Sequence, residues 1–190
     1  SPLRTSDTYN FFGYGTKGGI NYNIDNNHGV FANLGYFESG PFFNSVFANR
    51  NNEDINADAE NQKITSYELG YTFRGEKLSA NVNLYRTSWQ DRTEVARFQL
   101  QNGDVAFANI LGVGAIHQGI ELDVVYKATD KLSFTGMLSL GDWRWDNNVE
   151  NVQIFDETNT LVETVNLFIK DLHVGDAAQT TAALGLTYKL

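Results

Sequence analysis

Apolar and polar residues alternate strictly in several stretches of the chain, and short polar turns bound these stretches. The even positions of 116–126 are mostly apolar: Ile116, Gln118, Ile120, Leu122, Val124 and Tyr126. The odd positions include His117, Gly119, Glu121 and Asp123. Successive side chains of a strand point to opposite faces, so the pattern predicts strands with one apolar and one polar face. Strands of about ten residues with this dyad pattern are typical of those that cross a bilayer obliquely.

The pattern predicts eight strands, joined alternately by short and long connections. The predicted strands are 16–25, 29–38, 63–74, 77–89, 116–127, 131–145, 161–171 and 178–190. Short polar turns lie at 25–29, 74–77 and 127–131, and long connections at about 39–62, 90–115 and 146–160. Outer-membrane barrels sort their connections in this way, with short turns facing the periplasm and long loops facing outward. The predicted fold is therefore all-β: an antiparallel up-and-down transmembrane β-barrel.

The turns also repeat chemically. Residues 71–79 resemble residues 125–133: an aromatic and then a basic residue end one strand, and Lys-Leu-Ser begins the next. The last four residues, 187–190, repeat the start of that turn. We therefore expect 1–190 to be a section of one larger barrel domain. Four aromatic residues near the turns are expected to form part of an interfacial girdle: Tyr71, Phe73, Tyr126 and Tyr188.

Composition narrows the class of protein. Aromatic residues make up 13% of the 190 positions and proline occurs twice, which favours strands over helices. No run of eighteen apolar residues occurs, so no transmembrane helix is predicted. The net charge of −9 argues against a nucleic-acid partner. Without cysteine the chain has no disulfide, no thiolate zinc site and no cysteine nucleophile.

Three motifs, in order, resemble the C-terminal part of the barrel of TonB-dependent outer-membrane receptors. They are Tyr67-Glu68-Leu69-Gly70-Tyr71, the segment 83–92 that ends in Asp91-Arg92, and His117-Gln118-Gly119-Ile120-Glu121-Leu122-Asp123. The Asn-Pro that precedes the first motif in the family and the family's terminal aromatic residue do not occur here.

The resemblance implies a 22-stranded barrel of which this chain supplies about eight strands. It also implies a plug domain and a TonB-contacting segment, neither of which lies in this chain. The implied function is energised uptake of a scarce nutrient across the outer membrane of a Gram-negative-type bacterium. This section would supply wall strands and outer loops. Its implied partners are outer-membrane lipid, the rest of the barrel, the plug and TonB, and a surface lipoprotein is a further candidate partner. Metal chelates, glycans and peptides remain open as substrates.

No enzyme chemistry is indicated, and no catalytic residue, metal site or cofactor is predicted. His28, His117 and His173 are scattered and lack the spacing of metal ligands. The chain contains no nucleophile elbow. The run 49–61 carries Glu53, Asp54, Asp58 and Glu60, which are oxygen ligands suitable for calcium, but a solvated outer loop is the preferred interpretation.

Two groups of residues in the predicted outer parts are candidates for ligand binding. Phe42, Phe43 and Phe47 lie in the first long connection, where exposed rings either fold over neighbouring loops or meet a ligand or partner. Trp143, Arg144 and Trp145 lie at the outer end of a predicted strand and could stack on a ligand. The preferred alternative for Trp143 and Trp145 is the outer interfacial belt, because the two share a face.

Two other classes of protein remain open. One is a complete eight-stranded outer-membrane barrel with an adhesive or structural role. The other is a soluble, lipocalin-like ligand carrier, which would turn its apolar face inward. Burial of Ile120, Leu138 and Leu186 together inside a core would favour the carrier.

Overall fold

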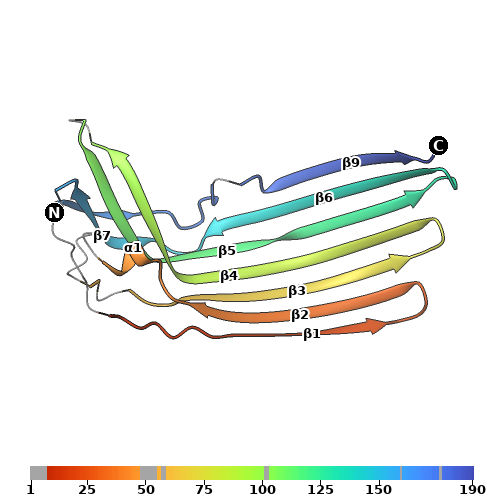
Figure 1. Cartoon of the computed structure of the whole chain (residues 1–190), viewed down its shortest axis with the longest axis horizontal. Helices are drawn as coiled ribbons and strands as arrows, with labels where there is room; N and C mark the ends of the chain where they lie inside the picture. Colours follow the sequence, from red (N-terminus) through yellow and green to blue (C-terminus); the bar gives the residue numbers. More distant parts are fainter. Residues whose placement is uncertain (1–7, 48–54, 57–58, 101–102, 159, 176) are drawn as a thin grey trace.

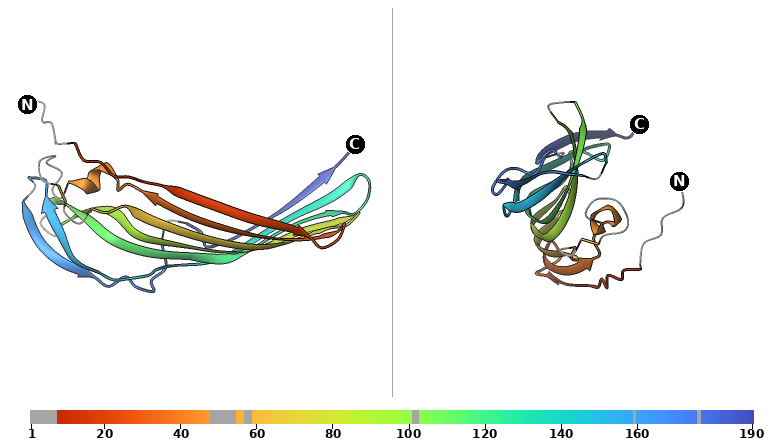
Figure 2. Two further views of the ribbon diagram at one scale, coloured as in Figure 1. Left: turned by 90° about the horizontal axis from the view of Figure 1, so that it is seen from below. Right: turned by 90° about the vertical axis from the view of Figure 1, so that its left-hand side faces the viewer.

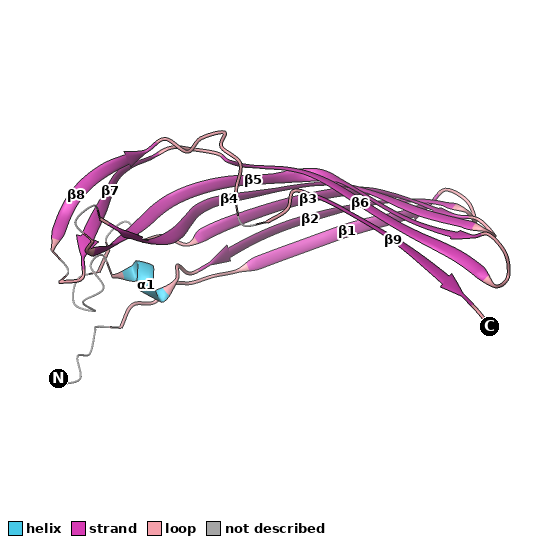
Figure 3. Ribbon diagram, turned by 90° about the horizontal axis from the view of Figure 1, so that it is seen from above, coloured by secondary structure: helices cyan, strands magenta, loops and turns pink. Residues whose placement is uncertain are grey.

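The computed structural model describes residues 8–47, 55–56, 59–100, 103–158, 160–175 and 177–190. Its elements are nine strands and one short helix (Figure 1; Figure 3). In chain order they are β1 (Gly15–Asn23), β2 (His28–Ser39), α1 (Phe43–Val46), β3 (Gln62–Arg74), β4 (Leu78–Gln99), β5 (Val105–Lys127), β6 (Leu132–Trp145), β7 (Val149–Asp156), β8 (Leu161–Leu167) and β9 (Thr180–Tyr188). The prediction of an all-β, antiparallel fold is confirmed.

Seven of these strands form a continuous antiparallel wall in the order β1-β2-β3-β4-β5-β6-β9. The three short turns that the sequence predicts lie together at one end of the wall, which we call the turn end (Figure 1, right). The helix α1 and the strand β7 lie at the opposite end, which we call the loop end (Figure 1, left). This sorting confirms the predicted alternation of short and long connections.

The wall is curved and open. Seen from the loop end it forms an arc, and α1 lies on the concave side of that arc (Figure 2, right). Within the described residues, β1 and β9 are the two edges of the wall and do not pair with each other. No helix in the described part of the chain combines the length and the apolar character needed to cross a membrane.

Strand pairing gathers the apolar positions on one face. Ile120 lies opposite Leu84 of β4 and Leu140 of β6, and its neighbours two residues along continue the same row. We call this the apolar face, and the opposite one, which carries Glu121 and Asn83, the polar face. On the polar face the Asn33 amide donates to Glu68 at 3.0 Å, and the Asn83 amide donates to Glu121 at 3.3 Å.

The apolar face is not covered by any described part of the chain. Ile120 is 39% exposed, Leu138 38% and Leu186 64%. These three residues are not buried together in a core, so the structure does not have the inward apolar face that a soluble carrier requires. A face of this kind needs an apolar environment outside the protein.

Glycines on the polar face let large rings lie flat against the wall. An added Cβ at Gly119 would lie 2.5 Å from the Leu140 carbonyl oxygen and 2.7 Å from the Tyr85 hydroxyl oxygen. An added Cβ at Gly70 would overlap the ring of Phe31. The glycines therefore provide the space in which neighbouring aromatic side chains pack across strands.

The turn between β1 and β2 is held by a carboxylate. Asp25 Oδ1 accepts hydrogen bonds from the backbone N–H of Asn27 at 2.7 Å and of His28 at 2.8 Å. An Asp that bonds the backbone two residues on is a common device in tight turns. The hydrogen bond from Asn27 is the main cause that lowers the pKa of Asp25, because it stabilises the charged form.

The loop end is more structured than the sequence predicts. The region 90–115, expected to be a long connection, is mostly strand, because β4 and β5 continue beyond the wall as a paired hairpin. The pairing shifts register on either side of Arg92, Asp91 has φ +55°, and Gly112 has φ +69°. Such bulges break the two-residue pattern and bend the strand, so alternation alone cannot follow the strand through them.

The expected connection 146–160 contains β7, and the segment 161–171, expected to be a wall strand, contains β8. This strand pairs with β7, and β7 pairs with β5 through Ala106, Phe107 and Ala108. The prediction of a wall strand at 161–171 is therefore wrong. The β7–β8 hairpin packs a small outer core, whose buried members are Ala106, Ala108, Val113, Val149, Val152 and Ile154. From 161–169, Val165, Leu167 and Ile169 pack against this core, whereas Leu161 and Val162 stay exposed, so the segment does not show the strict alternation of a wall strand.

We expect Gly119→Ala to lower the free energy of unfolding of the barrel that contains this chain by about 1–3 kcal/mol, because the new methyl group meets backbone that cannot move away. Gly136→Ala is the matched control, since its nearest neighbour, Leu184 Cδ2, lies 3.6 Å from the added atom. The control should change stability by less than about 0.5 kcal/mol. Urea unfolding of the barrel in lipid vesicles measures both, and equal stabilities would contradict the packing described here.

Candidate functional site

The three Phe residues predicted as ligand contacts differ in exposure. Phe42 and Phe43 are 62% and 64% exposed, whereas Phe47 is 3% exposed. The Phe47 ring contacts Tyr9 and Phe43 edge to face, and its carbonyl oxygen accepts from the Asn109 amide at 3.0 Å. Phe47 therefore anchors the α1 segment to β5, while Phe42 and Phe43 are left available on its surface.

The predicted trio at the end of β6 is divided between the two faces. Trp143 lies opposite His117 on the polar face, and Arg144 lies opposite Ile116 on the apolar face. Trp145 is partly buried against the outer core. The structure thus does not bring the trio together as one cluster. The register also places Trp143 on the same face as Glu121, which argues against the alternative that Trp143 belongs to a lipid-facing belt.

Four side chains on the polar face form what we call the aromatic row: Tyr85, Trp89, His117 and Trp143. The Trp143 Nε1–H donates to the Tyr85 hydroxyl oxygen at 2.9 Å. The ring of His117 lies 5.0 Å from that of Trp143 at 31° and 6.3 Å from that of Trp89 at 52°. The row crosses three neighbouring strands. Tyr85 and Trp89 belong to β4, His117 belongs to β5, and Trp143 belongs to β6.

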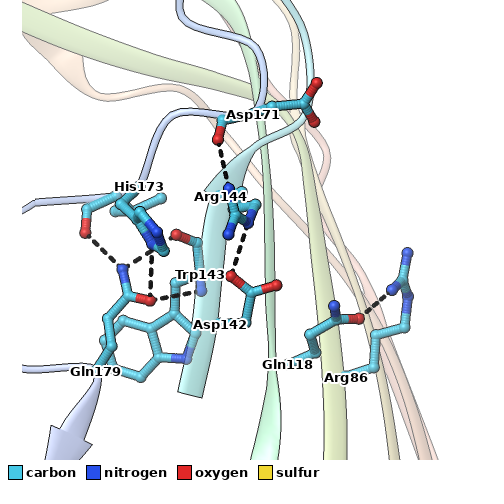
Figure 4. Close-up of polar contacts among 9 residues, drawn as sticks. Arg86, Gln118, Asp142, Trp143, Arg144, Asp171, His173 and Gln179 are labelled. Atoms are coloured by element: carbon cyan, nitrogen blue, oxygen red, sulfur yellow. Dashed lines mark hydrogen bonds and ion pairs between the residues drawn. The ribbon is translucent and has the colours of Figure 1, made fainter.

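The segment that leads into β9 fixes the end of the row. Gln179 Oε1 accepts from the backbone N–H of Trp143 at 2.9 Å, and Gln179 Nε2 donates to the Trp143 carbonyl oxygen at 3.1 Å (Figure 4). The same amide donates to the Val174 carbonyl oxygen at 3.1 Å, and His173 Nδ1 lies 3.2 Å from Gln179 Oε1. One glutamine side chain therefore joins β6 to the returning chain at the height of the aromatic row.

A cation lies over the other end of the row. The Arg92 guanidinium carbon is 5.5 Å from the centre of the Trp89 ring, within the range of a cation–π interaction. Arg92 also pairs with Glu94 at 2.8 Å. Two buried nitrogen atoms of the row, Trp89 Nε1 and His117 Nε2, have no hydrogen-bond partner within the described residues. The row therefore combines ring stacking with polar atoms that the wall leaves unpaired.

A cavity of about 490 Å³ lies beyond the row, between residues that precede β3, the bulges of β4 and β5, and β7. Its lining is largely polar and includes Asp91, Thr93, Asn109, Asn151 and Glu60. Asp91 is held by Lys63, whose Nζ lies 2.9 Å from the Asp91 carboxylate. Asp91 follows Trp89 by two residues in β4, so this strand carries a member of the aromatic row and, just beyond it, a residue of the cavity lining. We call the two together the mouth.

The mouth has the chemistry of a binding site. Stacked rings, amides and a few charges can hold a polar ligand that has flat or apolar parts. In the part of the chain that the structure describes, no three His, Asp or Glu side chains are grouped so that they could hold a metal ion. The run 49–61, interpreted as a solvated outer loop in preference to a calcium site, lies mostly outside the described residues.

Comparison of the sequence with known proteins identifies the family of the chain. Residues 3–190 match the family model described as TonB dependent receptor-like, beta-barrel. The chain belongs to this family of TonB-dependent receptor β-barrels. No curated protein and no solved structure gives a significant match.

Membership confirms the resemblance stated from the motifs and supports outer-membrane TonB-dependent transport in general. TonB-dependent receptor barrels lie in the outer membrane of Gram-negative bacteria, and the family implies a plug domain and a contact with TonB. It is a family of transporters and receptors and not of enzymes. In a transmembrane barrel the apolar face is the side toward lipid and the polar face lines the lumen.

Tyr85, Trp89 and His117 are site residues that the sequence analysis missed. A usable signal existed for each of them. All three occupy odd-numbered positions of β4 and β5, which lie on the polar face. Toward the loop end, aromatic residues at these positions replace the Asn and Glu residues found nearer the turns. The alignment of Tyr85 and Trp89 with Trp143 depends on the register of β4 with β5, which the sequence alone does not specify for strands expected to be joined through a long connection.

We expect Tyr85→Phe to destabilise the barrel by about 1 kcal/mol, because the partly buried Trp143 Nε1–H loses its acceptor. Tyr126→Phe is the matched control: Tyr126 is an exposed residue of the apolar face near the turn end, and its hydroxyl makes no hydrogen bond to a described residue. Unfolding followed by tryptophan fluorescence measures both variants. A destabilisation no larger for Tyr85→Phe than for the control would show that this hydrogen bond does not hold the row.

Proposed function

We propose that this chain forms part of the wall and outer mouth of a receptor that imports a nutrient across the outer membrane of a Gram-negative-type bacterium. The nutrient is a metal chelate, a glycan or a peptide. Uptake is driven through TonB, which contacts a part of the receptor outside this section. The observation that carries the proposal is the division of one wall into an apolar face without cover and a polar face that bears the aromatic row next to the mouth cavity.

Lipid is the proposed partner of the apolar face. The four aromatic residues expected to form a girdle near the turns, Tyr71, Phe73, Tyr126 and Tyr188, belong to this face, and the strand register adds Tyr22 and Phe134 to them. Girdle positions shift toward the turn end from β1 to β9, as the tilt of strands in a barrel requires. The two open edges, β1 and β9, need partner strands in a bilayer, because unpaired backbone groups are costly in hydrocarbon. We therefore place further strands of the same barrel at both edges.

The polar face is the proposed lining of the lumen and the surface that the plug contacts. Its amide and carboxylate ladders, Asn33–Glu68 and Asn83–Glu121, cross between strands below the aromatic row. Exposed amides and carboxylates can exchange hydrogen bonds with a plug that moves, since their alternative partner is water. The aromatic row and the exposed rings of Phe42 and Phe43 lie above these ladders, where an incoming nutrient would first meet the receptor.

We expect Leu184→Arg to reduce folding into lipid vesicles by about 2–4 kcal/mol, the cost of a cation that faces the middle of a bilayer. Leu184 is 94% exposed and belongs to the apolar face. Ala183→Arg is the control, because Ala183 is exposed on the polar face, opposite Met137. Folded fractions are measured by the heat-dependent migration of the receptor on gels. Normal folding of Leu184→Arg together with failure of Ala183→Arg would reverse the assignment of the faces.

We expect Trp143→Ala to weaken nutrient uptake by roughly fivefold or more, because aromatic contacts contribute much of the energy of binding sites. Phe134→Ala, an exposed ring of the apolar face, is the control and should leave uptake unchanged. The nutrient is identified by comparing growth on metal chelates, glycans and peptides with and without the full receptor. Uptake is then measured with that nutrient. Undiminished uptake by Trp143→Ala at normal receptor levels would remove the aromatic row from the binding site.

A further inference from the structure

Polar side chains replace apolar ones on the apolar face at the loop end of β4, β5 and β6. Arg86 follows Leu84, Gln118 precedes Ile120, and Asp142 follows Leu140 on this face. Strand pairing aligns these polar residues in one row, with Arg86 opposite Gln118 and Gln118 opposite Asp142. A step of two residues along a strand is about 7 Å. If the apolar face is set in lipid as proposed above, this polar row lies at the level of the outer headgroups.

The neighbouring strands are different at the same level. Tyr67 of β3 lies opposite Arg86, and Tyr36 of β2 and Tyr14 lie nearby with ring centres 5.7 Å apart. Aromatic residues are the usual side chains at a membrane interface. The sector of β4 to β6 therefore departs from an aromatic belt and presents hydrogen-bonding groups to the membrane surface.

Arg86 and Gln118 together present mainly hydrogen-bond donors. The Arg86 Nη1–H donates to Gln118 Oε1 (Figure 4). This bond uses one of the two lone pairs of the Gln118 amide oxygen, and it leaves the Nε2–H₂ group of Gln118 and the other N–H groups of the guanidinium available. Within the described residues no carboxylate lies within 4 Å of the Arg86 guanidinium nitrogens. The pair is therefore a cationic donor group without an anion.

Two acidic residues near Arg86 are engaged or turned away. The Asp142 carboxylate accepts from Arg144 Nε at 2.7 Å, and Arg144 Nη1 donates to the carbonyl oxygen of Asp171 at 2.9 Å. The carboxylate of Asp171 points away from Arg144 (Figure 4). A hollow of about 170 Å³ beside the pair is lined by Arg86, Gln118, Arg144 and three acidic residues, Asp142, Asp146 and Asp171. It is too small for a whole nutrient.

We propose that Arg86 and Gln118 bind the phosphate of an outer-leaflet lipid headgroup at the rim of the apolar face. Guanidinium and amide N–H groups are suited to phosphate oxygens. The acyl chains of the same lipid would lie along Leu84, Ile120 and Leu140, which continue directly toward the turn end on this face. The Arg86 guanidinium has no carboxylate within 4 Å in the described part of the chain, and the pair is continuous with an uncovered apolar surface; together these favour a lipid over a soluble anion.

The inference rests on the proposed placement in the membrane and not on the identity of the nutrient. Its test uses the full receptor in detergent, titrated with phosphatidylglycerol and with a diacylglycerol of the same chains, with bound lipid counted by native mass spectrometry. We expect Arg86→Gln to weaken phosphatidylglycerol binding about fivefold, which corresponds to about 1 kcal/mol for one cation near an anionic headgroup. Diacylglycerol binding should not change.

Arg97→Gln is the matched control. Arg97 is an exposed residue of the same strand, but it lies over the Phe107 ring in the outer hairpin, beyond the wall. It should bind phosphatidylglycerol as the unaltered receptor does. Equal lipid binding by Arg86→Gln and the unaltered receptor would overturn the proposal, as would displacement of the lipid by inorganic phosphate at a similar concentration, which would identify a site for a soluble anion.

The two proposals fail in different ways. If Leu184→Arg folds normally in vesicles, the placement of the apolar face in lipid is wrong. If Leu184→Arg fails to fold there, as expected, but Arg86→Gln retains phosphatidylglycerol fully, the placement stands and only the headgroup site is rejected. Loss of lipid with unchanged uptake would support a site that is separate from the transport pathway.

Discussion

The hydrogen-bonded register between neighbouring strands is the constraint on which the rest of this structure depends. Side chains alternate with a period of two, so a slip of one residue in any pair would move a whole strand's apolar set to the polar face. Here the pairs Leu84–Ile120 and Ile120–Leu140 hold the apolar face together across three strands. The same pairs place His117 between Trp89 and Trp143 on the other face. The lipid-facing surface and the aromatic row are thus two consequences of one register.

The bulges around Arg92 and Gly112 separate the wall from the outer part of the β4–β5 hairpin. Below them β4 and β5 pair without interruption from Leu78–Tyr126 to Trp89–Ala115, and above them the hairpin turns away and packs with β7. An uninterrupted ladder would carry the strict two-faced pattern beyond the membrane, where no lipid requires it. The bulges release the chain from that pattern, so Ala106, Ala108 and Val113 can form a core with Val149 and Val152.

The features that the sequence predicts correctly are those fixed by contact with lipid and by the two-residue period of a strand. The sequence located all seven wall strands and the three turns, with β4 and β5 predicted only over their parts within the wall, and it assigned the faces of 116–126. The failures lie at the loop end: β7, the continuation of β4 and β5, and the position of β8. There the apolar residues pack in a small local core, and their positions in the sequence follow no simple period. The same holds for the site. The sequence predicts that Trp143 lies at the outer end of its strand, but not its contact with Tyr85, because the two residues are 58 positions apart and meet only through the register of the strands between them.

Lipid constrains one face of each wall strand and leaves the other free, and this difference explains where specificity can arise. The side chains of the apolar face must be hydrophobic from β1 to β9, whichever nutrient the receptor transports. The polar face must only avoid unpaired buried groups, so Asn, Glu, Gly and aromatic residues can exchange there without affecting insertion. In this chain the polar face is made of small and amide side chains near the turns and of stacked rings near the mouth. Residues beyond the paired part of the wall contact these rings: Gln179 accepts a hydrogen bond from the Trp143 backbone N–H, and the Arg92 guanidinium lies over the Trp89 ring. A binding surface at this height can change with the nutrient while the lipid-facing wall remains the same.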